Sequence, residues 1–594
     1  MDPFLLETIK NPFSAPFLMM LQLILTAFVI LKLNFKVIID YKNKLSKLPP
    51  KEKYCNLAIL FVSLILFLSS TFLIFYKMTD VPSGAFEADE GALVVAAYYL
   101  KNLGHDSLEK KVPYYPYIDV NHHHERFTGF GQRGVPVYFQ AFTQYFVPPG
   151  FFSLRLECTV LMFITSIFLI YLLYLITGDI VPSILGGALF NVLPWTRVLA
   201  RVGPEATTYC FASACFLFSF LYFLNSKKLH AIVFYLVSLA ILYLSYPPGL
   251  LLAPLCGLLL PMIAARHSET DSAISKRIIL IGLIFLGLLF FDFHNDGGFK
   301  ESLSRAQNAQ GLVGIANFDL SALLNTFISR AKIYTGNYLG YLFPQFLFLT
   351  GDPNTRHNTG FGGQLFVSLC IAFYLGLFYL FEKRRESLPL KIILSYLLIA
   401  VIPAAVTIEG GLEIVTKLPL HGLRSSCILP PITIILVLGL IEIFKKKRII
   451  VFLYLVIVTV NAYLFYVDYF TKYPQRLGRA FDDAGLKDVS EKALLIIKKH
   501  PDKKLFFSAP FISIEFHNLD RIGIKALVNG GGLLSNVYHF ESRGNVEPQK
   551  GDLVLAHEPW NYGTFNKKFQ YILRVPNTSL GQGAFGASLF EITE

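Results

Sequence analysis

Charged residues are scarce in this sequence, and their scarcity argues against a soluble protein. Asp, Glu, Lys and Arg make up 16% of the 594 residues, whereas hydrophobic residues make up 54%. Soluble globular chains carry roughly 25% charged residues. With a mean hydropathy of +0.51, the chain is predicted to be a membrane protein.

Cysteine is also sparse, and its placement excludes a disulfide framework in the tail. None of the seven cysteines lies in the hydrophilic C-terminal part, and Cys210 and Cys215 lack the C-x-x-C spacing of zinc and redox sites. A cleavable signal peptide is not evident, because the apolar run 17–33 lacks a basic segment before it and a small-residue cleavage site. We interpret that run as a retained helix. The sequence has no Walker loop, G-x-S-x-G elbow or supported Rossmann fingerprint.

Long apolar runs are abundant. A membrane-spanning helix needs about 20 mainly apolar residues, and about twelve runs approach that length. The sequence therefore predicts a mainly α-helical, polytopic membrane bundle. The runs are 17–33, 55–76, 155–177, 180–195, 205–224, 231–246, 249–265, 278–292, 364–381, 392–407, 425–444 and 449–467.

The positive charge is concentrated in short loops between these runs. Lys and Arg outnumber Asp and Glu by 53 to 41, which gives a net charge of +12. Because cytoplasmic loops carry an excess of Lys and Arg, topology explains this charge better than binding to nucleic acid. The N-terminus, the long loops and the tail then face the extracytoplasmic side, and we expect a plasma-membrane location. The basic loops are 36–53, 227–228, 266–277, 383–391 and 445–448.

Composition divides the chain into three predicted regions. Residues 1–53 form an additional N-terminal helix and a cytoplasmic loop, residues 54–470 form the membrane module, and residues 471–594 form a small extracytoplasmic α/β domain. Within the module, 77–154 is the first extracytoplasmic loop, and its apolar run 91–103 is too short to span, so it predicts an interfacial helix. In the tail we predict a helix over 481–500 and strands over 504–508, 552–557 and 570–575.

One acidic group begins that interfacial helix. Glu87, Asp89 and Glu90 follow a Pro-Ser-Gly break in the first long loop. Helix N-termini favour negative charge, so one interpretation is that these residues stabilise the helix and have no other role. Alternatively, a carboxylate at the membrane surface acts there as a general base.

Three further polar groups flank the apolar runs on the outer side. Each has an ordinary structural explanation: a helix ion pair, a turn, or an arginine that reaches the lipid headgroups. Their common placement instead favours a site assembled at the membrane surface. The groups are Arg197, Arg201 and Glu205; Asp352, Arg356 and His357; and His421 with Arg424.

The order of these motifs resembles the GT-C superfamily of polyprenyl-phosphate-sugar-dependent glycosyltransferases, specifically the protein O-mannosyltransferase and aminoarabinose-transferase-like branch. The resemblance covers roughly residues 53–467, and the additional span 17–33 departs from it. The motifs are Asp89-Glu90; Gly104-His105-Asp106 with Pro113; Pro136-Val137-Tyr138; Ser153-Leu154-Arg155-Leu156; Pro194-Trp195 with Arg201 and Glu205; Phe346-Leu347-Phe348 with Gly351-Asp352 and Arg356-His357; and Leu420-His421-Gly422-Leu423-Arg424 with Leu429-Pro430.

The resemblance implies transfer of a hexosyl or pentosyl group from a polyprenyl-phosphate donor to an acceptor protein, lipid or polysaccharide. Asp89 matches the acidic first-loop position proposed as the base of an inverting displacement, and Glu90 can share that role. A cation near the leaving phosphate stabilises its developing charge. The residues expected to bind the donor phosphate are Arg201, Arg424, Arg356 and His357, and those expected to support them are Glu205, Asp352, Asp106 and His421.

We expect no metal and no other cofactor. His122, His123 and His124 are adjacent and are flanked by acids, which suggests a divalent metal site. However, adjacent side chains diverge in extended or helical backbone, so we interpret the triplet as a surface loop.

Three alternatives remain open from the sequence. A transporter would place ionisable residues within broken spans, whereas these spans are nearly free of charge. A non-catalytic scaffold or sensor gives no reason for the ordered motifs. An oligosaccharide ligase with a diphosphate-linked donor would have a closely similar topology.

Overall fold

The structure is a computed structural model of the chain. Its contacts divide the chain into two compact units, which we call the bundle unit (Ala15–Tyr76 and Cys158–Val467) and the loop–tail unit (Met1–Ser14, Lys77–Glu157 and Asp468–Glu594). The structure describes residues 3–10, 14–82, 90–106, 109–111, 113, 116–118, 130–131, 134–226, 228–267, 279–287, 320–384, 386–406, 420–477, 486–507, 537–539, 549–557, 568–575 and 587–593.

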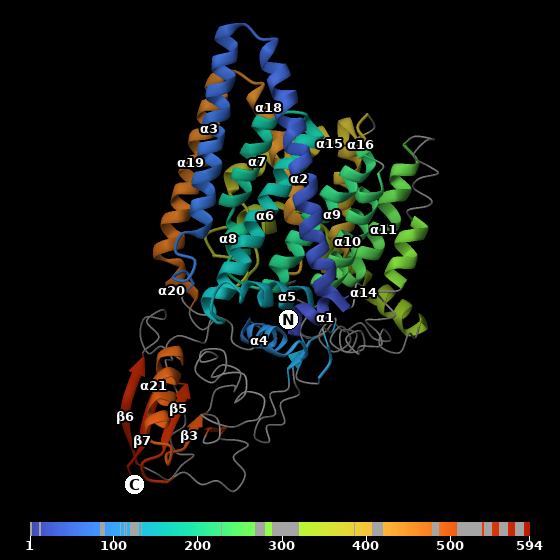
Figure 1. The fold of residues 1–594 in the computed structure, drawn as a ribbon. Helices are drawn as coiled ribbons and strands as arrows, with labels where there is room; N and C mark the ends of the chain where they lie inside the picture. The colour runs from blue at the N-terminus through green and yellow to red at the C-terminus, as the bar shows by residue number, and fades with distance from the viewer. Residues whose placement is uncertain are drawn as a thin grey trace. The chain divides into compact units, whose positions relative to one another are not determined.

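The bundle unit consists of helices that run roughly alongside one another (Figure 1). Several begin where the sequence carries a helix-start signal: Pro50, Pro194 and Pro430 occupy first-turn positions, and Asp179 caps the backbone N–H of Val181. The helices are α2 (Ala15–Ser46), α3 (Pro50–Phe75), α6 (Phe151–Thr177), α7 (Ile180–Val192), α8 (Pro194–Leu199), α9 (Pro204–Ser226), α10 (Leu229–Ser245), α11 (Gly249–Ala265), α14 (Leu320–Gly340), the π-helix η2 (Gln345–Leu349), the 3₁₀ helices η3 (Val367–Leu369) and η5 (Ser426–Ile428), α15 (Cys370–Lys383), α16 (Leu388–Ala400), α17 (Ile402–Ala405), α18 (Leu429–Phe444) and α19 (Arg448–Thr471).

In the part of the chain that the structure describes, seven helical segments are long and apolar enough to cross a membrane, and the chain is an integral membrane protein. They are α2, α3, α6, α9, the joined helices Leu388–Ala405, the segment Ser426–Phe444 and α19. The predicted mainly helical, polytopic fold is confirmed. Helices α7, α10 and α11, which match three more predicted runs, are shorter than a full span.

The count of about twelve spans stays a prediction. Of the run 278–292, the structure describes helical residues 279–287, and the run 364–381 contains α15, which has 14 residues. Helix α14 was not predicted, because Arg330 and Lys332 interrupt its apolar residues. It lies within the segment 293–363 that the sequence analysis assigned to a loop.

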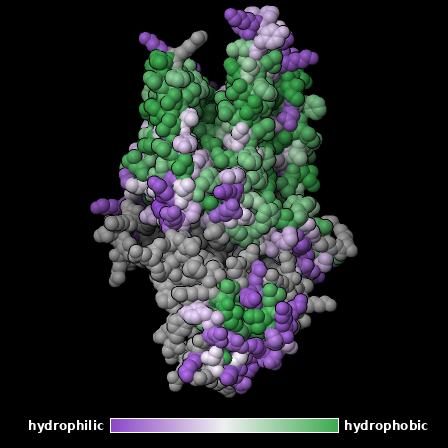
Figure 2. Space-filling view, turned by 90° about the vertical axis from the view of Figure 1, so that its left-hand side faces the viewer, coloured by the Kyte–Doolittle hydropathy of each residue, from purple (hydrophilic) through white to green (hydrophobic). Residues whose placement is uncertain are grey.

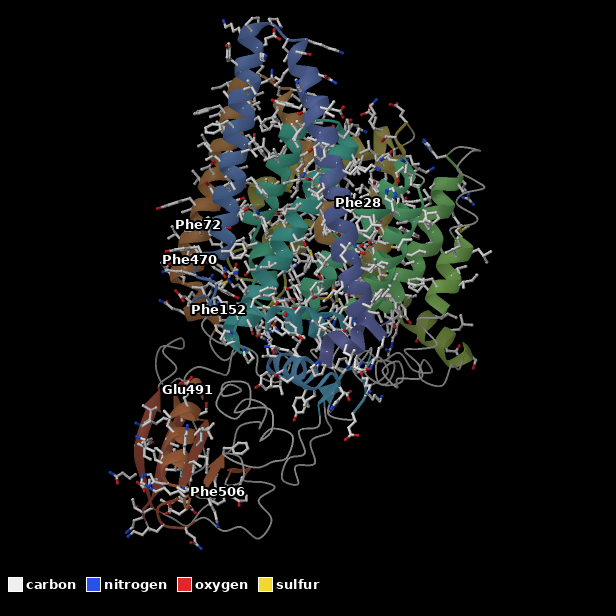
Figure 3. All side chains as sticks on the ribbon, in the orientation of Figure 1. Phe28, Phe72, Phe152, Phe470, Glu491 and Phe506 are labelled. Atoms are coloured by element: carbon white, nitrogen blue, oxygen red, sulfur yellow. The ribbon has the colours of Figure 1, made fainter. Side chains whose placement is uncertain are left out.

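The helices of the bundle differ in how much of their apolar span is buried. The buried share is 94% in the central helix α9, but 17% in α3 and 11% in α19, which lie on the outside. The face of the bundle shown in Figure 2 is accordingly largely hydrophobic. Phe28 of α2 and Phe72 of α3 are exposed by 51% and 69% on the outside of the bundle (Figure 3). A large exposed apolar surface on a helical bundle fits contact with lipid.

Helices α15 and α18 approach each other closely through two glycines. A Cβ atom on Gly376 would overlap the carbonyl oxygen of Ile435, and one on Gly439 would overlap that of Ala372. Small residues at helix interfaces in membranes allow such backbone contact. Any larger side chain at either position would push the two helices apart.

The loop–tail unit begins with α1 (Pro3–Lys10), which packs against the predicted interfacial helix, α4 (Ala92–Leu103). Gly104, with φ +76°, ends α4 in the left-handed conformation that favours glycine. A two-stranded antiparallel ladder, β1 (Tyr117–Ile118) with β2 (Phe130–Gly131), precedes α5 (Gly134–Thr143), which packs on α4.

The tail contains α20 (Tyr473–Leu477), α21 (Leu486–Lys499) and a five-stranded sheet of order β4-β3-β5-β7-β6. Strand β3 pairs in parallel with β4 and β5, whereas β7 pairs antiparallel with β5 and β6. Phe506 of β3 (Figure 3) packs with Val554, Phe590 and Ile592 in a buried cluster. The predicted small α/β fold is therefore confirmed. The strands are β3 (Leu505–Phe507), β4 (Val537–His539), β5 (Leu553–His557), β6 (Phe569–Val575) and β7 (Ala587–Ile592).

Candidate functional site

Two buried arginines bind the C-terminal end of α3. Arg201 is fully buried and donates hydrogen bonds to the carbonyl oxygens of Ile74 (2.6 Å) and Tyr76 (3.3 Å) and to the Thr159 hydroxyl (3.0 Å). Arg197 donates to the carbonyl oxygens of Leu73 and Tyr76. The last carbonyls of a helix lack intrahelical partners and carry partial negative charge, so both guanidinium groups act as cationic caps.

These contacts bear on the predicted phosphate-binding role of Arg201. Carbonyl oxygens already account for its buried charge, and its 0% exposure leaves no surface through which a phosphate could reach it in this conformation. The arrangement favours a structural role for Arg201. Neighbouring Glu205, which we expected to support the site, lies at the start of α9 and is partly exposed.

In the loop–tail unit, Glu90 forms a buried ion pair with Arg155. Glu90 immediately precedes the start of α4 and Arg155 lies in the first turns of α6; their side-chain atoms approach to 3.7 Å, and their residue exposures are 2% and 0%. The Arg155 guanidinium also lies 4.7 Å from the centre of the Phe151 ring. Arg155 was part of a quoted motif but was not predicted as a site residue. Asp89, the predicted base, lies outside the described residues, as do His122, His123 and His124.

A tyrosine pair packs in the same unit. Tyr469 and Tyr473 stack with their ring centres 5.3 Å apart, and the Tyr469 hydroxyl donates to the carbonyl oxygen of Val81 in the first loop. Burial raises the pKa of the Tyr473 hydroxyl, while the positive charges of Arg155 and Arg476 act in the opposite direction. The Tyr473 phenol is therefore protonated at neutral pH.

Asp106, expected as a supporting residue, organises a local turn. Its carboxylate accepts a hydrogen bond from the backbone N–H of Lys110 at 2.9 Å, and its own N–H donates to the Lys110 carbonyl at 3.0 Å. Asp106 is buried with 2% exposure. These contacts shape the chain that follows α4.

In the bundle unit, Asp352 joins two loops that are far apart in sequence. Its Oδ2 lies 2.9 Å from Nδ1 of His357 and accepts a hydrogen bond from the backbone N–H of Gly422 at 2.6 Å. Its Oδ1 accepts from the backbone N–H of Asn354 at 2.8 Å. Every carboxylate oxygen of Asp352 is therefore engaged, and the loop before α15 is tied to the loop before η5.

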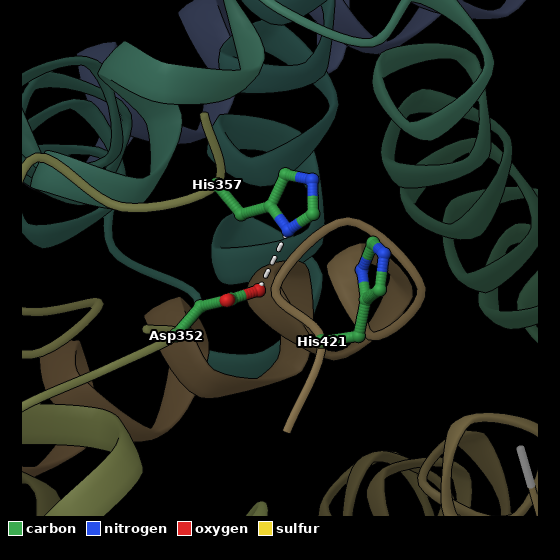
Figure 4. Close-up of side chains that lie close together, drawn as sticks. All are labelled: Asp352, His357 and His421. Carbon is green, nitrogen blue, oxygen red and sulfur yellow. Dashed lines mark hydrogen bonds and ion pairs between the residues drawn. The ribbon is translucent and has the colours of Figure 1, made fainter. Parts of the chain in front are cut away.

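The rings of His357 and His421 stack beside this carboxylate (Figure 4). Their centres lie 4.2 Å apart with an interplanar angle of 28°. Asp352, His357 and His421 are all buried, with exposures of 5%, 7% and 8%, and each offers a ligand atom within 4.8 Å of the others. Sequence analysis named all three residues but did not predict that they form one cluster.

The remaining predicted phosphate ligands flank this cluster along the chain. Arg356 and Arg424 are each adjacent to it in sequence and partly exposed. The backbone N–H of Arg424 donates to Nδ1 of His421 at 3.4 Å. Arginine is well suited to bind an anion, because its planar guanidinium can donate two parallel hydrogen bonds. The contact of Arg356 and Arg424 with a donor phosphate stays a prediction, because no ligand is present.

A second layer holds the cluster in place. Trp195 donates through its indole N–H to the carbonyl oxygen of Gly422 at 3.2 Å, and the Tyr341 hydroxyl accepts from the backbone N–H of His421 at 3.0 Å. A Cβ on Gly422 would lie 2.7 Å from Nε2 of Gln364 and 3.1 Å from the carbonyl oxygen of His357, so a larger residue here would require the Gln364 side chain to move. Trp195 was quoted among the motifs, but only the fold reveals that it supports the histidine loop.

No family model matches this sequence, and comparison with curated proteins found no match. Solved structures do match. ArnT from Cupriavidus metallidurans bound to undecaprenyl phosphate superposes with a TM-score of 0.51 at 11% identity, over 89% of this chain and 97% of ArnT. The apo state of the same protein gives a TM-score of 0.50 at 10% identity.

The apo oligosaccharyltransferase of Archaeoglobus fulgidus gives a TM-score of 0.43 at 13% identity, and the match spans 79% of this chain but 64% of the archaeal chain. Of these two proteins, ArnT is the one whose TM-score is high enough to indicate a shared fold, and at 11% identity the match is evidence for the fold alone. The chain thus has the polytopic helical membrane fold of ArnT, and a fold of this kind was predicted from the sequence.

Proposed function

We propose that the protein is an integral membrane glycosyltransferase that uses a polyprenyl-phosphate-linked sugar. The observation that carries the proposal is the ArnT match, which extends over 97% of ArnT and 89% of this chain. That ArnT structure contains undecaprenyl phosphate. A fold does not by itself determine an activity, so the ordered motifs of the sequence supply the second line of support.

The proposed donor is an amphiphile with two different requirements. Its polyprenyl tail needs an apolar surface, which the lipid-facing helices of the bundle provide, and its phosphate needs cationic donors near the headgroup layer. Arg424 is our first candidate for this phosphate, with Arg356 and His357 next to it. A bidentate arginine matches phosphate geometry better than an ammonium does.

The proposed reaction is a single inverting displacement on the extracytoplasmic face. The acceptor hydroxyl oxygen attacks the anomeric carbon of the donor sugar, and the bond from that carbon to the phosphate oxygen breaks. The hydroxyl proton passes to a carboxylate, and polyprenyl phosphate leaves with the electron pair of the broken bond. Cationic side chains at the phosphate lower the barrier because negative charge develops there.

Asp89 is the proposed base. Its neighbour Glu90 forms the buried ion pair with Arg155, so the Glu90 carboxylate is already engaged with the first turns of α6. We therefore assign proton abstraction to Asp89 and orientation of the interfacial helix to Glu90. The sequence alone allowed both acids to act as the base, whereas this proposal gives that role to Asp89.

The test combines a donor panel with one substitution. Purified protein is incubated with polyprenyl-phosphate and polyprenyl-diphosphate sugars, including hexoses and pentoses, together with protein, lipid and polysaccharide acceptors, and release of the polyprenyl carrier is measured. We expect release from a monophosphate donor. We also expect that Asp89→Asn lowers turnover by about 10²-fold or more, the scale of a lost general base.

Asp80→Asn is the matched control, because Asp80 is an exposed aspartate in the same part of the chain. It should retain normal turnover. Near-normal turnover by Asp89→Asn would remove Asp89 from the mechanism. Release from diphosphate donors only would identify an oligosaccharide ligase, and binding of donor without release by any acceptor would favour a transporter.

A further inference from the structure

We infer that Asp352, His357 and His421 form a divalent metal site with a preference for zinc. This inference does not depend on the proposed glycosyl transfer, because it stands on the geometry of the cluster. The three residues come from two loops, and each presents one oxygen or nitrogen atom that can ligate a metal. In the described part of the chain, this is the one group of such residues with its ligand atoms close together.

The distances in the cluster are close to those of a loaded site. Tetrahedral zinc sits about 2.0–2.2 Å from nitrogen and carboxylate ligands, which places neighbouring ligand atoms about 3.3 Å apart. Oδ2 of Asp352 and Nδ1 of His357 are already 2.9 Å apart, and all three ligand atoms lie within 4.8 Å of one another. A rotation of the His421 ring would bring its nitrogen into range.

The cluster has the outer contacts that orient metal ligands. Asp352 is fixed by the backbone N–H groups of Asn354 and Gly422. The backbone of His421 is held through its N–H by the Tyr341 hydroxyl and through its carbonyl by the Ser425 hydroxyl at 3.0 Å. Ligands held in this way lose little conformational freedom when they bind an ion.

A plain aspartate–histidine hydrogen bond is the competing explanation. It accounts for Asp352 and His357 but gives no reason for a second imidazole stacked 4.2 Å from the first. Two stacked imidazoles with a carboxylate beside them match the two-histidine, one-carboxylate donor set of many zinc sites with an open coordination position. Nitrogen ligands favour zinc over magnesium, which prefers an all-oxygen shell.

An ion here would change the electrostatics of the flanking loops. A bound metal would add positive charge between two loops that also carry the partly exposed residues Arg356 and Arg424. An open coordination position accepts an oxygen ligand, such as water or a phosphate oxygen. Both histidines would then act as ligands, so neither would donate a proton from its metal-bound nitrogen.

The test measures metal binding to the full-length protein in detergent, without donor or acceptor. Its result is therefore independent of whether the protein transfers a sugar. The protein is stripped with a chelator and titrated with Zn²⁺ and, separately, with Mg²⁺; bound metal is measured by elemental analysis and calorimetry. We expect about one zinc per chain for wild type, in keeping with one three-ligand site, and no saturable binding of magnesium.

His421→Ala and Asp352→Asn should each weaken zinc binding by about 100-fold or more, because each removes a ligand. His230→Ala is the matched control, since His230 lies on α10 outside the cluster, and it should bind zinc normally. Absence of zinc binding by wild type, or equal affinity in wild type and both cluster variants, would overturn the assignment. If a cluster variant does not fold, X-ray absorption of zinc-loaded wild type decides, because a shell without two imidazoles would also overturn it.

Discussion

Arg201 offers a direct test of whether a buried guanidinium caps a helix or binds a ligand. We consider Arg201→Met, which keeps most of the side-chain volume and removes the charge and all donors. The substitution leaves the carbonyl oxygens of Ile74, Tyr76 and Ala200 without the donors that now reach them at 2.6, 3.3 and 3.0 Å. The Thr159 hydroxyl also loses its donor.

The expected cost follows from these contacts. Each buried acceptor that loses its partner costs about 1–3 kcal/mol before relaxation. Arg197 still donates to the Tyr76 carbonyl, and the Thr159 hydroxyl already donates to the Ala200 carbonyl at 3.1 Å, so these two acceptors keep a partner in the variant. The Ile74 carbonyl loses the donor that reaches it at 2.6 Å, and we therefore expect a net loss of about 1–3 kcal/mol, the cost of a buried acceptor that loses its partner.

The assay is thermal unfolding of detergent-purified protein, followed by helix circular dichroism, together with the donor KM of any variant that remains active. Arg201→Met should lower the unfolding temperature by several degrees. The control Arg266→Met, at an exposed residue that ends α11, should leave it unchanged. An unaltered unfolding temperature combined with a steep rise in donor KM would refute the capping argument and restore Arg201 as a phosphate ligand.

Two further predictions concern other parts of the chain. Arg424→Lys should raise the donor KM and lower turnover, because lysine lacks the planar fork that pairs with two phosphate oxygens. If the rate depends on donor concentration as in wild type, Arg424 contacts the lipid headgroups and not the donor. Phe590→Ala removes a ring that is 1% exposed in the buried cluster of the sheet, and it should destabilise the tail domain by about 3–5 kcal/mol. We expect faster limited proteolysis after residue 486, with no change in the helical circular dichroism of the bundle.

The sequence predicts helices and strands well where few alternatives exist. The apolar run 249–265 matches α11 at both ends, and the run 552–557 differs from β5 by one residue. In both cases the spacing of the apolar residues and the helix- or strand-breaking residues on either side determine where the element begins and ends. Helix α14 was missed because Arg330 and Lys332 interrupt its apolar residues, so it contains no long apolar run.

The site was less predictable, for two physical reasons. A guanidinium donates equally well to phosphate and to carbonyl oxygens, so residue type alone does not reveal that Arg201 meets the end of α3. The cluster of Asp352, His357 and His421 requires two loops to meet, and no sequence period relates a residue at 352 to one at 421. Such contacts follow only from the packing of the helices between them.

The glycine contact between α15 and α18 has a consequence for that cluster. The loop with Asp352 and His357 leads into η3 and α15, and the loop with His421 leads into η5 and α18. Because backbone touches backbone at Gly376 and Gly439, the two helices have almost no room to slide or shear against each other. The distance between the two loops therefore depends on this backbone contact in the apolar interior, and a larger side chain at Gly376 or Gly439 would alter the geometry of the distant cluster.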